Sequence, residues 1–108
     1  AVMSVIEMIR DHLHESLTLD DCSRHVHLSS SYFANVFKKV TGLSFYQYLT
    51  KERMEKAAKL LMEDYQVQEV AASVGYGDRR YFSDAFKKHT GMTPTNFKNK
   101  YHPQSSDV

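Results

Sequence analysis

The chain contains the same phrase twice, and this repeat constrains its fold more than any other feature. The stretch YFANVFKKVTG, residues 32–42, returns 49 residues later as YFSDAFKKHTG, residues 81–91. The shift superimposes Tyr, Phe, Phe, Lys, Lys, Thr and Gly, which is far more identity than a shared helix propensity would produce. The chain of 108 residues therefore contains a duplicated unit.

Each copy has the apolar spacing of a helix with one face toward a core. The residues at i, i+3, i+4 and i+7 are Phe33, Val36, Phe37 and Val40 in the first copy and Phe82, Ala85, Phe86 and His89 in the second. Ser29 and Asp78 can cap the amino ends of these helices. Gly42 and Gly91 can adopt the left-handed conformation that follows a helix. The predicted helices span residues 30–41 and 79–90.

A shorter amphipathic segment precedes each of these helices. Its inward residues are Leu19, Cys22, Ser23 and Val26 in the first copy and Val67, Val70, Ala71 and Val74 in the second. The short segments match at a shift of 48, so the second turn has one extra residue. Thr18 and Asp21 form a capping box for the first short helix, and Gly75 ends the second. A short helix, a tight turn and a longer helix make a helix-turn-helix unit.

Three more helices are predicted outside the two pairs. Residues 44–63 lack Pro and Gly and predict one helix of roughly 30 Å, with a broad apolar stripe of Tyr48, Leu49, Met54, Ala57, Leu60 and Leu61. An opening helix over residues 2–14 turns Ile6, Ile9 and Leu13 inward. A closing helix over residues 94–101 has Thr93 as its cap and Pro94 at its first position.

The predicted fold class is all-α, a seven-helix bundle in which a long linker helix joins two helix-turn-helix units. We expect a single domain over residues 1–108. Its parts are a first helix-turn-helix unit over about residues 5–43, the linker helix over 44–63, a second unit over 64–102 and a tail over 103–108.

Composition and charge narrow the function classes. A hydrophobic content of 42% excludes a disordered chain, and the sequence has neither an apolar run long enough for a membrane span nor a secretory leader pattern. Residues 1–27 carry a net charge of −3 and the remaining 81 carry +4, so the basic charge lies in the repeated part. We expect a cytoplasmic protein with Cys22 buried and reduced. Because the chain opens with Ala1 and enters a helical pattern at once, we expect it to be a piece of a longer protein.

If the second helix of each pair is a recognition helix, its solvent face should read base edges and bind phosphates. The base-reading candidates are Ser31, Ala34, Asn35, Arg79, Arg80, Ser83 and Asp84. Asn can pair with adenine, Arg with guanine, and Asp can accept from the cytosine amino group. The phosphate candidates are Lys38, Lys39, Lys87, Lys88, Tyr32 and Tyr81. The alternative for the polar residues is a merely solvated helix face, and for the two tyrosines packing at the edge of the stripe is favoured over a phosphate contact.

The sequence offers little for catalysis or metal binding. The His25–His27 and His12–His14 pairs are spaced i and i+2, which points the two rings to different sides of a helix, whereas zinc needs three or four convergent ligands. No Gly-rich phosphate loop, nucleophile elbow or His-Glu-x-x-His motif is present. We therefore expect no enzyme, no metal and no cofactor. Arg53 is as consistent with an ion pair as with a phosphate contact.

The segment VAASVGYGDRRYFSDAFKKHTGMTPTNFK, residues 70–98, resembles the signature of AraC/XylS-family transcriptional regulators. The first copy followed by YLTKERMEKAAKLL is similar to the output domains of YesN-like response regulators. The resemblance spans about residues 6–101. It implies sequence-specific binding to promoter DNA, with both recognition helices in neighbouring major grooves. It also implies a sensor or receiver domain N-terminal to this unit, and RNA polymerase as a partner.

The chain departs from the family pattern at Asn35 and Asp84, where many relatives are basic, and at Phe97-Lys98, where the family has an aromatic residue followed by Arg. The alternative function is a helical protein-interaction module that contacts RNA polymerase or a partner regulator through its acidic first helix. Salt-dependent retention on heparin is expected for a DNA-binding domain and not for such a module.

Overall fold

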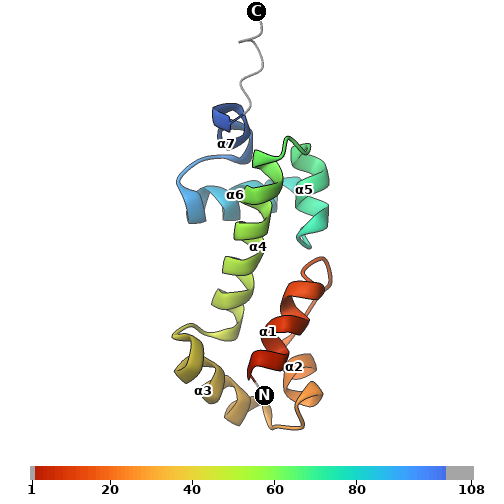
Figure 1. Cartoon of the computed structure of the whole chain (residues 1–108), viewed down its shortest axis with the longest axis vertical. Helices are drawn as coiled ribbons and strands as arrows, with labels where there is room; N and C mark the ends of the chain where they lie inside the picture. Colours follow the sequence, from red (N-terminus) through yellow and green to blue (C-terminus); the bar gives the residue numbers. More distant parts are fainter. Residues whose placement is uncertain (1, 102–108) are drawn as a thin grey trace, which may run out of the picture. The chain divides into compact units, whose positions relative to one another are not determined.

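The computed structural model describes residues 2–101, which fold into seven α-helices and contain no β-strand (Figure 1). The helices are α1 (Val2–Asp11), α2 (Leu19–His25), α3 (Ser30–Thr41), α4 (Phe45–Met62), α5 (Val67–Ser73), α6 (Arg79–Thr90) and α7 (Pro94–Tyr101). The predicted all-α class and the seven helices are confirmed. The predicted tail, residues 103–108, lies outside the described residues.

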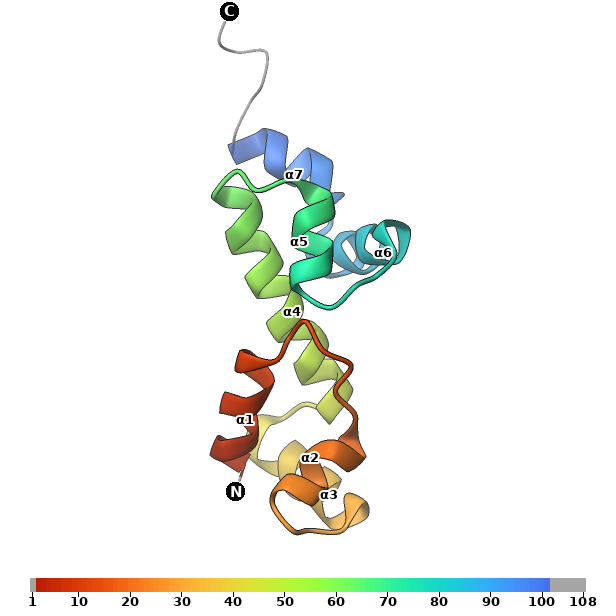
Figure 2. The same cartoon turned by 90° about the vertical axis from the view of Figure 1, so that its right-hand side faces the viewer.

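The helices form two compact units, each with a core of its own. The first unit ends at Glu52 and contains α1, α2, α3 and the first part of α4; the second begins at Arg53 and contains the rest of α4 and α5 to α7 (Figure 2). Aromatic pairs mark both cores. The Phe37 and Tyr48 rings lie 5.3 Å apart at 88°, and the rings of their counterparts in the repeat, Phe86 and Phe97, lie 5.2 Å apart at 77°. Such edge-to-face packing is favoured between aromatic rings.

The long helix α4 belongs to both units. Phe45, Tyr48 and Leu49 are buried in the first core, and Met54, Ala57 and Leu61 in the second, where Leu60 is only partly buried. The step of five residues from Leu49 to Met54 breaks the three-and-four spacing of a single helical face. The prediction of one broad stripe was therefore wrong, because the two parts of α4 bury separate sets of side chains.

The boundaries of α3 and α6 are those predicted. The Ser29 hydroxyl accepts a hydrogen bond from the Tyr32 amide at 3.2 Å, and the Asp78 carboxylate accepts one from the Arg80 amide at 2.8 Å. Gly42, with φ of 80°, and Gly91, with φ of 87°, follow the two helices in the left-handed conformation. Both caps satisfy amide groups that have no partner within the helix.

The two turns differ by one residue, as predicted: residues 26–29 join α2 to α3, and residues 74–78 join α5 to α6. Each turn passes through a left-handed residue, which is His27 with φ of 58° in the first unit and Gly75 with φ of 91° in the second. The next amide then donates back to the short helix. Leu28 donates to the Ser23 carbonyl at 2.9 Å, and Tyr76 donates to the Ala71 carbonyl at 2.8 Å.

Two expectations about helix ends were wrong. The opening helix ends at Asp11 and not at residue 14, because the His12 amide is shared between the Met8 and Ile9 carbonyls, a pattern common at helix termini. Leu13 is still buried beyond the helix end. Val40, predicted to face the core, is 61% exposed, and His89 is also exposed. In α3 and α6 the last fully buried side chains are Phe37 and Phe86, so the final turn of each helix extends past its core.

Candidate nucleic-acid interface

The candidate interface is the solvent face of α3 and α6, opposite their buried phenylalanines. Phe33 and Phe37 have no exposed surface, and neither do Phe82 and Phe86, so the other side of each helix is turned to water. Of the predicted base-reading residues, Ser31, Asn35, Arg79, Arg80 and Asp84 are exposed, while Ala34 and Ser83 are partly buried. Their accessibility meets the first requirement for contact with a base edge.

The predicted phosphate-binding lysines lie at the carboxyl ends of the same helices. Lys38 and Lys39 in α3 and Lys87 and Lys88 in α6 are all exposed. Positive charge in the last turn also interacts favourably with the helix dipole. These lysines therefore stabilise their own helices while remaining accessible to an anion.

Tyr32 and Tyr81 begin the repeated phrase, and both are largely in solvent. The Tyr32 side chain is 59% exposed and Tyr81 is 73% exposed. The favoured interpretation, packing at the edge of the apolar stripe, was therefore wrong. A contact from the phenol to a phosphate remains a prediction for both residues.

Arg53 is half-buried at the start of the second unit. Its guanidinium lies 5.7 Å from the centre of the Tyr76 ring, a cation–π geometry. Burial lowers the pKa of Arg53, and the interaction with Tyr76 raises it. Because Tyr76 lies in the turn between α5 and α6, the contact ties α4 to the second helix-turn-helix.

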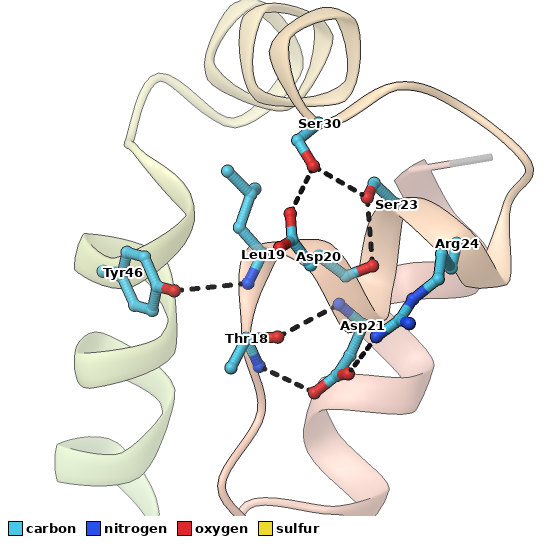
Figure 3. Close-up of polar contacts among 8 residues, drawn as sticks. All are labelled: Thr18, Leu19, Asp20, Asp21, Ser23, Arg24, Ser30 and Tyr46. Carbon is cyan, nitrogen blue, oxygen red and sulfur yellow. Dashed lines mark hydrogen bonds and ion pairs between the residues drawn. The ribbon is translucent and has the colours of Figure 1, made fainter.

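The first unit carries a polar network between α2, α3 and α4 that the sequence analysis missed (Figure 3). The Ser30 hydroxyl donates to the Asp20 carboxylate and lies 3.3 Å from the Ser23 hydroxyl, which donates to the Asp20 carbonyl at 3.0 Å. Beside it the Leu19 amide donates to the Tyr46 phenol oxygen at 3.3 Å. Ser23 was predicted to face inward and is buried, but its contact with Ser30 joins two helices and is brought about only by the fold.

The second unit has an open polar recess of about 290 Å³ between α5, α6 and α7. Its polar lining comprises Gln66, Gln68, Arg79, Thr95, Lys98 and Asn99. The repeat gives a signal for one residue of this recess, because the 49-residue shift aligns Arg79 of α6 with Ser30 of α3. Arg79 thus lies on the exposed face of α6 and also at the edge of this recess.

Within residues 2–101, no cluster of three or more His, Cys, Asp or Glu side chains is arranged to hold a metal ion. In the same part of the chain, no helix is long and apolar enough to cross a membrane. Cys22 is fully buried, and burial, with a smaller effect of the Asp21 charge, raises the pKa of its thiol to about 11. At neutral pH this cysteine is therefore a protonated core residue.

Comparison with known proteins identifies relatives along almost the whole chain. The helix-turn-helix domain family matches residues 22–100. The chain is 32% identical over 109 residues to the uncharacterized HTH-type transcriptional regulator YijO of Escherichia coli K12, covering 96% of this chain and 38% of YijO. It is 36% identical over 104 residues to the uncharacterized transcriptional regulatory protein YesN of Bacillus subtilis 168, covering 92% of this chain and 28% of YesN. The chain thus spans less than two fifths of these curated relatives.

Two solved structures share both the fold and part of the sequence. The C-terminal domain of AraT, a response regulator from Geobacillus stearothermophilus, is 37% identical with a TM-score of 0.87, covering 92% of this chain and 84% of that chain. The DNA-binding domain of AdpA, a global transcriptional factor whose structure was determined in complex with a target DNA, is 27% identical with a TM-score of 0.89. That likeness covers 95% of this chain and 96% of the AdpA domain.

Proposed function

The chain belongs to the AraC-type helix-turn-helix family of transcriptional regulators, and on this premise we propose that it binds double-stranded DNA sequence-specifically to regulate transcription. The single observation that carries the proposal is the duplicated helix-turn-helix with two exposed recognition faces, on α3 and α6. The AdpA DNA-binding domain, which has the same fold, was captured on a target DNA. Phosphate contacts would supply affinity and base contacts specificity.

In this proposal, the exposed faces of α3 and α6 each contain residues that contact bases and residues that contact phosphates. Arg80 would pair with guanine through two hydrogen bonds, Asn35 with adenine, and Asp84 would accept from the cytosine amino group. Ser31, Ala34, Arg79 and Ser83 complete the proposed base-reading set. The exposed lysines at the helix ends, together with Tyr32 and Tyr81, would bind phosphates.

We further propose that this chain is the output domain of a longer cytoplasmic regulator. Its relatives YijO and YesN are more than twice its length, and AraT, whose C-terminal domain it resembles, is a response regulator. A sensor or receiver domain N-terminal to this unit would supply the input, and RNA polymerase would be the partner at the promoter. The two units would act together as one DNA-binding domain.

Fluorescence anisotropy on duplexes enriched from a randomised pool tests the proposal. We expect the domain to bind enriched duplexes more tightly than scrambled ones. We also expect the affinity to fall steeply between about 50 and 200 mM salt, because the slope of log affinity against log salt is roughly proportional to the number of phosphates neutralised. With a formal net charge of only +1, the isolated domain should bind weakly. No enrichment, together with no retention on heparin, would favour the protein-interaction module instead.

A further inference from the structure

The polar recess of the second unit has a counterpart in the first unit, and the two have diverged. The repeat aligns Arg79 with Ser30 and, at its 48-residue shift, Gln68 with Asp20. It also aligns Thr95 with Tyr46, and Lys98 with Leu49. The two units therefore have different residues at equivalent positions, which can be compared directly.

In the first unit this position carries a carboxylate. The Ser30 hydroxyl donates to the Asp20 carboxylate, and the Leu19 amide donates to the Tyr46 phenol oxygen at 3.3 Å (Figure 3). A second anion brought here would meet a fixed carboxylate at short range, where like charges repel most strongly. The Asp20 carboxylate therefore disfavours an anion at this position of the first unit.

In the second unit the same place is open and basic. A threonine replaces the tyrosine, an amide replaces the carboxylate, and an arginine and a lysine replace a serine and a leucine. The described residues that line the recess include no carboxylate. Lys98 is offset only in part, since its ammonium lies 3.6 Å from the Asp64 carboxylate, which is mostly exposed. The lining thus combines two cations with amide and hydroxyl donors around a space large enough for a tetrahedral oxyanion.

We propose that this recess holds one phosphate group, with Arg79 and Lys98 supplying charge and Gln68, Thr95 and Asn99 supplying neutral donors. This inference rests on the proposed function: the group is a phosphodiester of the DNA backbone, which the second unit binds at this position and the first does not. Arg79 then acts as a phosphate contact, and base reading on α6 falls to Arg80, Ser83 and Asp84. Charged, multidentate contacts of this kind are the stronger hydrogen bonds of proteins.

The first test uses inorganic phosphate and the folded domain. Phosphate titrated into the ¹⁵N-labelled protein at constant ionic strength should give saturable amide shifts at Gln68, Arg79 and Thr95, with none at the aligned Asp20, Ser30 and Tyr46. Gln68→Asp, which introduces the carboxylate found in the first unit, should abolish the shifts, and Ser4→Asp, an equal charge change outside the recess, should retain them. Absence of saturable shifts in the recess would overturn the phosphate site.

The second test measures DNA affinity against salt for the same variants. Gln68→Asp should lower the magnitude of the logarithmic salt slope by about 0.9, the loss of one phosphate contact, on specific and scrambled duplexes alike. Ser4→Asp, an equal charge change at an exposed residue of α1, should keep the wild-type slope. Phosphate shifts with equal slopes in all variants would assign the recess to free phosphate and overturn the DNA assignment. Failure of the wild-type chain to bind any DNA would refute the proposed function separately, while the phosphate titration would still decide on the recess.

Discussion

The side chains of α3 and α6 have two tasks: Phe33, Phe37, Phe82 and Phe86 pack in the cores, and residues on the opposite faces are exposed for the proposed contacts with DNA. The burial of the repeat phenylalanines in α3 and α6 and the cap residues Ser29 and Asp78 were predictable, because burial and capping follow from spacing and side-chain type within one helix. The exposure of Tyr32 and Tyr81 was not, since a residue at the edge of a stripe is covered only if another element reaches it. The Ser30–Asp20 hydrogen bond likewise joins two helices and leaves no trace in local spacing.

Arg80 tests whether α6 reads bases or only binds phosphates. Arg80→Ala should cost roughly 1–3 kcal/mol on the preferred site and relax the preference at one base position. Lys88→Ala, which removes an exposed cation from the same helix, should weaken binding to all sequences alike. Quantitative binding to the selected duplex and to single-base variants of it measures both effects. An equal loss for Arg80→Ala on specific and scrambled DNA would make Arg80 another phosphate contact.

His27 occupies a backbone conformation for which the second unit uses glycine. A side chain at φ of 58° costs roughly 1–2 kcal/mol of backbone strain, which a glycine would relieve. Glycine also has more conformational freedom in the unfolded chain, and this offsets about half of the relief. His27→Gly should therefore stabilise the domain by about 0.5–1 kcal/mol, measured by urea denaturation. Gly75→Ala, at φ of 91°, should destabilise it. If His27→Gly lowered the free energy of unfolding, side-chain contacts of His27 would have to outweigh its backbone strain.

Cys22 makes stability depend on pH in the alkaline range. Its thiol has a pKa of about 11 in the folded chain, against an ordinary value of 9.0. A raised pKa means that the neutral thiol stabilises the fold below pH 9, and that this contribution is lost as pH rises from 9 to 11. Wild type should therefore lose more stability over this window than Cys22→Ala, measured by thermal unfolding at each pH. Equal losses in the two proteins would show that Cys22 does not contribute.

At the scale of helices, boundaries with a strong end signal were predicted closely and those without one were not. Helices α3, α6 and α7 match their predicted spans because each begins after a Ser, Asp or Thr cap, and the first two are followed by Gly. The α1 helix has no such stop, and it ends three residues early. Periodicity also misjudged α4, since a helix shared by two cores does not keep one buried face.

The caps of the two recognition helices should each contribute measurably to stability. Ser29→Ala and Asp78→Ala each remove a side-chain acceptor from an amide in the first turn, and each should cost about 1 kcal/mol in the free energy of unfolding. Ser29→Asn, which keeps an acceptor at this position, should cost much less. Chemical denaturation of the three variants compares them. Equal destabilisation by Ser29→Asn and Ser29→Ala would mean that the hydrogen bond is not the source of the effect.

At the scale of the whole molecule, the duplication, the number of helices and the family could be predicted from the sequence, because all three follow from patterns repeated along the chain. The central claim, which stays a proposal, is that both units bind one DNA duplex at the same time, each through its recognition helix. Its physical basis is that each unit contains one exposed recognition helix, α3 in the first and α6 in the second. Successive major-groove entries on one face of B-DNA are ~34 Å apart, and each would take one of these two helices.

Footprinting of the major groove on a duplex selected from a randomised pool tests the central claim most directly. We predict two protected patches on one face of the duplex, about 10–11 base pairs apart, one for α3 and one for α6. Protection of both should weaken together as salt is raised. A single patch on the selected duplex would contradict the account, because only one of the two helix-turn-helix units would then engage DNA.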